Sequence, residues 1–121
     1  MTYNDAMNLT SSPLSKRQVI VHVDGRLDAE TCTALKQAFH DFAGSGVQYV
    51  TVEMKGVTFI DSSGLSALIS GLKTLRQAGG GLNLAAVGPQ ARTALRLTLL
   101  DTVLPIFDTT ADASAALTPK E

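Results

Sequence analysis

The sequence predicts an α/β domain in which a mixed, mostly parallel sheet of about four to five strands is packed by about four helices. Two observations predict this fold class. Apolar, β-branched runs alternate with amphipathic segments along the whole chain, a pattern typical of successive βαβ units. The chain has 121 residues, 45% of them hydrophobic and 17% charged, which is enough for one compact domain with its own core.

Two strands are expected before the first helix. The run Val19-Ile20-Val21-His22-Val23 is nearly continuous in β-branched residues and predicts a strand over residues 18–23. A weaker strand is expected around residues 7–9, joined to the first through a turn at Ser11-Ser12-Pro13. This N-terminal hairpin would supply the antiparallel pair of an otherwise parallel sheet.

The first helix is predicted over residues 29–43. Asp28 stands where an N-cap is expected, and Gly44-Ser45-Gly46 ends the helix. Its apolar residues recur at three- and four-residue spacing, so one stripe of the helix is expected to be buried. That stripe comprises Cys32, Leu35, Ala38, Phe39 and Phe42.

The next strand and helix bracket a short linker. Residues 49–54 alternate as a strand does, and Gly56 begins a half-buried connection. A second helix is predicted from Ser62 or Ser63 to Ala78, where three glycines end it. Its core stripe is expected to comprise Leu65, Leu68, Ile69, Leu72 and Leu75.

The C-terminal third continues the alternation. A strand is predicted over residues 82–87, and Pro89 suits the first position of a third helix. Residues 104–107 are expected to form an edge strand, because proline is tolerated there. The alanine-rich residues 111–117 are expected to form a short helix. Three leucines cannot all face the core, and one or two of them could extend an interaction surface: Leu97, Leu99 and Leu100.

The organisation expected is one domain with short ends. Residues 1–16 are an N-terminal segment with a possible edge strand, residues 17–117 are the domain itself, and residues 118–121 are a frayed tail. The first 16 residues lack the charged start and apolar block of a secretory signal, and no apolar run approaches the roughly 20 residues of a membrane span. A cytoplasmic protein is therefore expected.

Composition narrows the function classes. The formal net charge is −1 and tryptophan is absent, which argues against direct nucleic-acid binding or attraction to an anionic membrane. The single cysteine, Cys32, excludes an internal disulfide framework and cysteine-rich zinc sites. No metal-ligand spacing and no phosphate-binding glycine motif is present, so neither a metal nor another cofactor is expected.

The segment Asp61-Ser62-Ser63-Gly64 holds the most chemistry, because it lies where an extended segment turns into a helix. Unpaired N–H groups and the positive end of the helix dipole meet there. Four interpretations are open: an ordinary helix cap, a phosphorylated serine, a bound anion, or a hydrolytic nucleophile. The first is common, since serine and aspartate are preferred residues at helix starts.

The hydrolase interpretation has little support. The motif lacks the first glycine of G-x-S-x-G, and a catalytic triad needs a histidine. The chain has only His22, expected within a strand, and His40, expected near the end of the first helix, and both are expected to be structural. The protein is therefore predicted not to be an enzyme.

The sequence around this motif resembles the STAS domains of bacterial anti-sigma factor antagonists. The specific match is Val57 to Leu65, which contains D-S-S-G-L. Weaker matches are Asp24-Gly25-Arg26-Leu27-Asp28, the strand at residues 50–54, the glycine turn and strand at residues 76–86, and Leu97-Thr98-Leu99-Leu100-Asp101. The resemblance covers roughly residues 17–117.

The resemblance implies a phosphorylation switch. It implies that the unphosphorylated protein binds an anti-sigma factor that is also a serine kinase of the histidine-kinase-type ATPase fold, and that a metal-dependent serine phosphatase reverses phosphorylation. It implies Ser63 as the phosphoacceptor. The partner-binding residues expected from it are Asp28, Asp61, Ser62, Ser63, Gly64 and Leu65. A monomer or weak dimer without membrane insertion is expected.

Two positions depart from the family pattern, and two rival functions remain. Glu53 stands where aspartate is common, and Leu99 stands where the family usually has glycine, so the turn before Asp101 is expected to differ. The first rival is a STAS adaptor subunit of a lipid-transport or other membrane complex. The second is a small hydrolase that uses Ser63.

The charge pattern leads to a hypothesis about the switch. The nearest basic residues in sequence to Ser63 are Lys55 and Lys73. A phosphate is therefore expected to act by charging an interface and not by recruiting an arginine that rearranges the domain. The stretch from Ser62 to Leu100 has no acidic residue, and its basic residues are expected to be either solvated helix faces or a rim for an acidic partner: Lys73, Arg76, Arg92 and Arg96.

Overall fold

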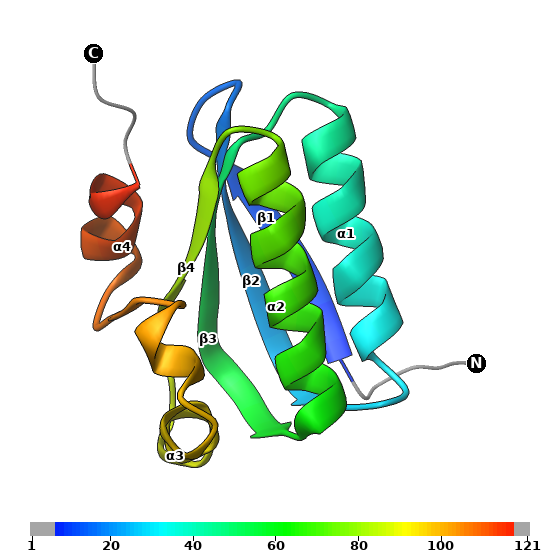
Figure 1. Ribbon diagram of the computed structural model, residues 1–121, viewed down its shortest axis with the longest axis vertical. Coiled ribbons are helices and arrows are strands. Elements are labelled where there is room, and N and C mark those ends of the chain that lie inside the picture. Colours follow the sequence, from blue (N-terminus) through cyan, green and yellow to red (C-terminus); the bar gives the residue numbers. More distant parts are fainter. Residues whose placement is uncertain (1–6, 118–121) are drawn as a thin grey trace.

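The computed structural model describes residues 7–117, which form a five-stranded sheet and four α-helices. The elements are β1 (Met7–Pro13), β2 (Gln18–Leu27), α1 (Cys32–Gly44), β3 (Tyr49–Ile60), α2 (Ser62–Gln77), β4 (Gly81–Ala85), α3 (Pro89–Leu97), a 3-10 turn η1 (Leu100–Thr102), β5 (Ile106–Phe107) and α4 (Thr110–Ala116). The strands follow one another in chain order across the sheet (Figure 1). β1 is antiparallel to β2, and the other neighbours are parallel. This confirms the predicted fold class.

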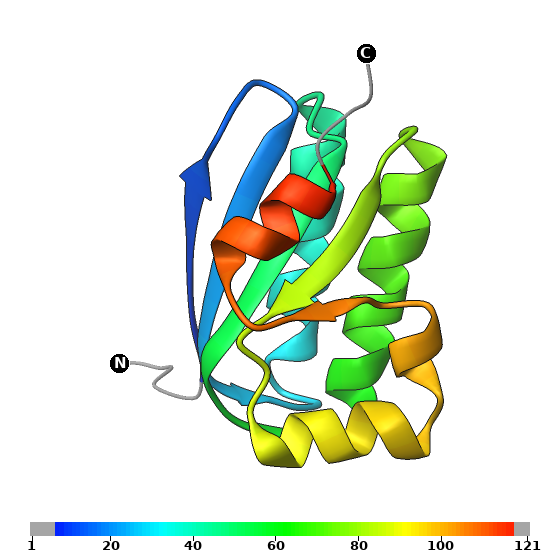
Figure 2. The ribbon, with the colours of Figure 1, turned by 90° about the vertical axis from the view of Figure 1, so that its left-hand side faces the viewer.

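The two faces of the sheet are covered differently. Helices α1 and α2 lie side by side over one face (Figure 1). On the opposite face α4 crosses β3 and β4 and also contacts the start of β2, where Gln18 bonds the Ser114 carbonyl (Figure 2). Helix α3 lies at the end of the sheet where α2 begins. The site built at the start of α2 is therefore bordered by β2, β3 and α3.

The core lies between the sheet and the α1–α2 layer. Val21, Val50 and Val52 are 0% exposed beneath the helices. The predicted stripe of α2 is confirmed, with only Ile69 left half-buried. The two helices approach closely at Gly71, where an added Cβ would lie 2.4 Å from the ring of Phe39. A larger residue there would force the helices apart.

Helix α4 is attached through polar contacts to the sheet face opposite the core. The buried Asn83 amide donates to the Ala113 carbonyl at 2.7 Å, and it accepts from the Thr51 hydroxyl at 2.8 Å. Gln18 donates to the Ser114 carbonyl at 2.8 Å. These contacts satisfy the amides that would otherwise be buried without partners.

Two strand predictions need correction. β1 runs on to Pro13, so Ser11-Ser12-Pro13 is strand and not turn, and the chain reverses after it, where the Leu14 N–H bonds the Gln18 carbonyl. β3 does not end at residue 54. It continues to Ile60 because β2 extends beside it to Leu27, with two register shifts that absorb the irregularity near Gly56.

The two C-terminal strands are shorter than predicted. β4 covers Gly81–Ala85, because Ala86 has a φ of 55° and turns the chain away from the sheet. Residues 106–107 form the edge strand β5, within the predicted range of 104–107. The predicted tail at residues 118–121 and the first six residues of the N-terminal segment lie outside the described residues.

The turn after α3 keeps a left-handed residue although the sequence has no glycine there. Leu99 has a φ of 62° and ψ of 15°, a conformation that costs an L-residue about 1 kcal/mol relative to glycine. Its side chain is 68% exposed and that of Leu97 is 76% exposed, whereas Leu100 packs partly against the core. The departure from the family pattern at Leu99 is therefore accommodated by strain, and two of the three leucines lie on the surface.

Candidate functional site

The start of α2 is capped by Asp61. Its carboxylate Oδ1 accepts hydrogen bonds from the N–H groups of Ser63, at 2.9 Å, and Gly64, at 3.1 Å. The Asp61 carbonyl accepts from the Leu65 N–H at 2.9 Å, which begins the helical pattern. The predicted helix start at Ser62 is thus confirmed, and the capping side chain is the aspartate that precedes the two serines.

Because Asp61 supplies the cap, both serine hydroxyls are left over. Ser62 and Ser63 are the first two residues of the helix, the former exposed and the latter half-buried. Within residues 7–117 neither hydroxyl forms a hydrogen bond. A free hydroxyl at a positively polarised helix start is a suitable acceptor for a phosphoryl group, since the helix end stabilises the added negative charge.

Gly64 is required by a close approach to β2. A Cβ at this position would lie 2.3 Å from the Leu27 carbonyl oxygen and 2.7 Å from Cγ1 of Ile60. The Asp61 N–H also donates to the Leu27 carbonyl, at 3.3 Å. The helix start is therefore pressed against the end of β2, and only glycine fits at that contact.

Leu65 points into the core and is 7% exposed. Together with the buried Gly64, it anchors the helix start beneath the surface on which Ser62 is presented. The two residues predicted to bind a partner at the end of the motif thus lie below its exposed part. Their contribution to the site is to hold the serines in position.

Asp28 was predicted to cap the first helix, but it closes a tight loop after β2 and does not cap α1. Its Oδ1 accepts from the Glu30 N–H at 3.1 Å, and its carbonyl accepts from the N–H groups of Thr31 and Cys32. The helix consequently begins at Cys32, with Thr31 at the N-cap position, and not at residue 29. The Thr31 hydroxyl accepts from the Asp28 N–H at 3.0 Å and donates to the Arg26 carbonyl at 2.8 Å, which consumes it within the loop.

The electrostatics of this loop favour an ionised Asp28. Its Oδ2 accepts from Arg26 Nε at 3.1 Å. Burial opposes ionisation, but the Arg26 hydrogen bond, the Glu30 N–H and the positive charge of Arg26 together outweigh it, and the pKa of Asp28 lies below its ordinary value. The loop therefore presents a stable carboxylate next to the start of α2.

Two residues of the site were not predicted from sequence. Arg26 lies near the start of α2 because its neighbour Leu27 accepts a hydrogen bond from the Asp61 N–H. In the chain 35 positions separate Arg26 from Asp61. Its guanidinium lies 4.5 Å from the centroid of the Phe59 ring and bonds Asp28. The only sequence signal for Arg26 was its place in the Asp24–Asp28 segment. The structure alone reveals that this guanidinium is already engaged.

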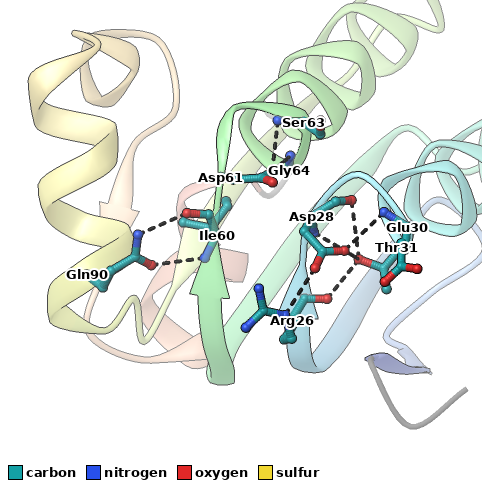
Figure 3. A network of polar contacts seen from close by, with 9 residues as sticks. All are labelled: Arg26, Asp28, Glu30, Thr31, Ile60, Asp61, Ser63, Gly64 and Gln90. Carbon is teal, nitrogen blue, oxygen red and sulfur yellow. Dashed lines mark hydrogen bonds and ion pairs between the residues drawn. The ribbon is translucent and has the colours of Figure 1, made fainter.

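Gln90 is the second such residue. Its side-chain amide donates to the Ile60 carbonyl at 2.9 Å and accepts from the Ile60 N–H at 2.9 Å. β4 stops pairing with β3 at Glu53, so Gln90 takes the place of a neighbouring strand at the residue just before Asp61 (Figure 3). Nothing in the sequence near residue 90 indicated this contact.

Figure 3 shows the arrangement that results. Asp61, Ser63 and Gly64 lie between the Asp28 loop on one side and Gln90 of α3 on the other. Of the six predicted site residues, five are consecutive at the start of α2, and Asp28 comes from the loop after β2. The site is a helix start that is capped by a carboxylate, is bordered by hydrogen bonds to Leu27 and Gln90, and presents two hydroxyls.

Two further features of the described part of the chain bear on function. No group of three or more histidine, cysteine or carboxylate side chains among residues 7–117 could hold a metal ion. In the same part of the chain no helix has the length and apolarity needed to cross a membrane.

Comparison with known proteins identifies the family. Residues 11–113 match the STAS domain. An anti-sigma F factor antagonist from Paenibacillus polymyxa is 26% identical over 100 residues, which are 82% of this chain and 86% of that protein. The crystal structure of an anti-sigma factor antagonist from Mycobacterium paratuberculosis has a TM-score of 0.83 and 26% identity, and the match covers 97% of this chain and 98% of that one.

A third comparison shows the fold alone. The phosphorylated form of the Bacillus cell fate determinant SpoIIAA has a TM-score of 0.73 at 16% identity, over 92% of this chain and 100% of that one. The fold, the D-S-S-G-L helix start and these matches agree. The chain therefore belongs to the STAS domain family.

Proposed function

We propose that this protein is an anti-sigma factor antagonist that is switched by phosphorylation of Ser63. The observation that carries the proposal is the start of α2, where Asp61 supplies the cap and leaves two serine hydroxyls without intramolecular partners in residues 7–117. An ordinary cap does not need the second serine. The named relatives from Paenibacillus and Mycobacterium support the same role.

The proposed partner of the unphosphorylated form is an anti-sigma factor that is also a serine kinase of the histidine-kinase-type ATPase fold. It would dock over the start of α2 and the Asp28 loop and place its nucleotide next to the Ser63 hydroxyl. A metal-dependent serine phosphatase would restore the free hydroxyl. The protein itself acts through this exchange of partners, as a monomer or weak dimer that does not bind nucleic acid directly.

Phosphorylation would switch binding by charge. A phosphoserine adds about −1.5 to −2 charges at neutral pH. The carboxylate of Asp61 already bonds the Ser63 N–H, and the guanidinium of Arg26 is held by Asp28 and Phe59. Releasing that guanidinium to meet the phosphate would break both contacts. The added charge therefore stays at the interface and repels the partner, while the backbone keeps its conformation.

Ser63, and not Ser62, is proposed as the acceptor, and the family resemblance decides between them. The geometry is compatible with Ser63 as the acceptor, because the Asp61 carboxylate fixes the Ser63 N–H. A fixed backbone limits the positions that the hydroxyl can take, which favours a defined transfer geometry.

Binding of a purified partner tests the proposal. The candidate partner is a histidine-kinase-type ATPase from the same organism, and its affinity is measured by calorimetry for the wild type and for Ser63→Ala, Ser63→Asp and Ser62→Ala. A loss of about 3–4 kcal/mol corresponds to two to three decades in affinity, and we expect it for Ser63→Asp only. Equal affinity of all four proteins would contradict the switch and favour a constitutive adaptor.

A further inference from the structure

Another serine, Ser12, is hydrogen-bonded to a histidine on the face of the sheet opposite α1 and α2. Nε2 of His22 lies 2.9 Å from Oγ of Ser12, and Nδ1 of the same ring lies 2.7 Å from Oε1 of Glu53. The three side chains come from β1, β2 and β3, so they cross the sheet in one line. This cluster is separate from the start of α2, to which none of its residues belongs.

The register of the strands places the three residues together. His22 is the direct neighbour of Glu53 in the parallel β2–β3 pair. Ser12 pairs with Ile20 in the antiparallel β1–β2 pair, which makes it the diagonal neighbour of His22. Residues two apart on a strand share a face, so all three side chains lie on the face opposite the α1–α2 core.

The hydrogen bonds fix the protonation of the neutral imidazole. The ionised carboxylate of Glu53 only accepts, so Nδ1 of His22 carries the proton. Nε2 then holds a lone pair and accepts from the Ser12 hydroxyl. A hydroxyl bound to an imidazole nitrogen, with a carboxylate behind the ring, is the arrangement by which serine nucleophiles are activated.

The cluster is also accessible. The side chains of His22 and Glu53 are each 29% exposed, and Ser12 is exposed on the edge strand of the sheet. In Figure 2 β1 lies at the edge of the sheet, on the far side of β2 from β3 and β4, which α4 crosses. A small acyl donor can therefore reach Oγ of Ser12 without any rearrangement of the described elements.

We propose that Ser12 is an activated nucleophile that accepts an acyl group from activated esters or thioesters. Oγ of Ser12 forms a bond to the carbonyl carbon while its proton passes to Nε2 of His22. Glu53 stabilises the imidazolium that results. The bond to the leaving group then breaks, the leaving group takes the proton from His22, and an ester on Ser12 remains. This is a stoichiometric modification of the protein, and no turnover is implied.

The size of the effect follows from general-base catalysis. A positioned base contributes about 10²–10⁴-fold to the rate of such a transfer. We expect the lower part of this range, because the cluster lies on an open sheet face and water competes for the imidazole. Ser15 serves as the internal reference, since it is also exposed and its Oγ contacts the backbone N–H of Arg17 and no imidazole.

The experiment treats the full chain with p-nitrophenyl acetate and measures the acetylated fraction at each serine by fragment mass spectrometry. In the wild type, Ser12 should be acetylated about 100-fold faster than Ser15. His22→Gln should reduce the rate at Ser12 to that of Ser15, and Glu53→Gln should give an intermediate rate. Adduct formation is the readout, because an exposed imidazole can release p-nitrophenolate on its own.

Two controls keep the outcome clear. Thermal unfolding shows that each variant is folded, and Ser63→Ala tests independence from the proposed switch, since it should leave the rate at Ser12 unchanged. Equal rates at Ser12 and Ser15 in the wild type would overturn the proposal. So would a rate at Ser12 that His22→Gln does not lower, because the histidine would then be a structural partner only.

Discussion

The starts of α1 and α2 both follow a parallel strand and an aspartate, yet the two aspartates do different things. Asp61 gives its carboxylate to two N–H groups of the helix that follows it. Asp28 uses its carboxylate on Arg26 and on the Glu30 N–H, before its helix begins. The same residue type therefore caps one helix and closes a loop ahead of the other.

The difference determines which hydroxyls remain free. At α1 the Thr31 hydroxyl is consumed by the loop and is 3% exposed. At α2 the cap lies before the serines, so their hydroxyls stay available on an anchored helix start. The free hydroxyls at the start of α2 thus depend on two features. The capping side chain belongs to Asp61, the residue before the serines, and the backbone is hydrogen-bonded on both sides, by Leu27 and by Gln90.

The largest effect is expected at the contact that anchors α2. Gly64→Ala should destabilise the protein by about 3 kcal/mol, because the new Cβ would meet the Leu27 backbone oxygen, which cannot move independently of β2. Urea unfolding measures the loss. Gly44→Ala is the matched control, since a Cβ there meets nothing within 4 Å, and it should stabilise α1 by about 0.5–1 kcal/mol. Similar losses in both variants would contradict the anchoring contact.

The cap at α2 should account for the next effect. Asp61→Ala removes the acceptor for two helix N–H groups and should cost about 1–2 kcal/mol in the free energy of unfolding. Asp61→Asn keeps a good cap and should lie within about 0.5 kcal/mol of the wild type. Both are measured by the same urea unfolding. If Asn were as damaging as Ala, the charge and not the hydrogen bonds would explain the stability of this helix start.

Gln90 offers a way to loosen α2 from its other side. In Gln90→Glu the ionised side chain cannot donate to the Ile60 carbonyl, so about 1 kcal/mol should be lost at neutral pH. The carboxylate still accepts from the Ile60 N–H, so urea unfolding at neutral pH measures the loss of the other bond. Protonating the glutamate at low pH restores a donor and should reverse the change. A free energy of unfolding at neutral pH that does not differ from the wild type would show that the Gln90 contact does not hold this segment.

The smallest effect is expected at the Asp28 loop, where the Arg26 side chain is 54% exposed and solvent screens the ion pair. The folded pKa of Asp28 is lowered, so its stabilisation is present above the unfolded pKa of about 4 and is lost as pH falls through the folded value. Asp28→Asn should therefore be less stable than the wild type at pH 7, and the difference should shrink at acid pH. A difference that is constant with pH would contradict this sign.

Periodicity predicted the parts of the molecule that depend on it. The α/β class, the buried stripe of α2 and the start of α2 all follow from apolar spacing and from the residues that stop helices. Of the predicted α1 stripe only Leu35 and Phe39 are buried, and the rest is half-buried. The start of α1 does not follow from the sequence pattern. The Asp28 carboxylate accepts from the Glu30 N–H within a tight loop, and the helix begins only at Cys32. The local sequence pattern does not show whether an aspartate will cap a helix or close a loop before it.

Other features required the fold itself. Gln90 and Ile60 are separated by 30 positions, and their contact exists only because β4 ends before β3 does. Arg26 was absent from the predicted electrostatics because its position beside Phe59 depends on the pairing of β2 with β3. The Ser12–His22–Glu53 line depends on the register of three strands, and the interpretation of residues 11–13 as a turn concealed it. Side-chain chemistry was readable from sequence, whereas cross-strand neighbours were not.

The proposed switch depends most directly on whether the Ser63 hydroxyl carries a phosphate. Intact and fragment mass spectrometry on the protein from its native cells, taken in growth and under stress, measures that state. The proposed switch predicts a single phosphate on the peptide that contains Ser62 and Ser63. This phosphate is localised to Ser63, and its occupancy changes between the two conditions. No phosphate in either condition, or a phosphate on Ser62 alone, would contradict it.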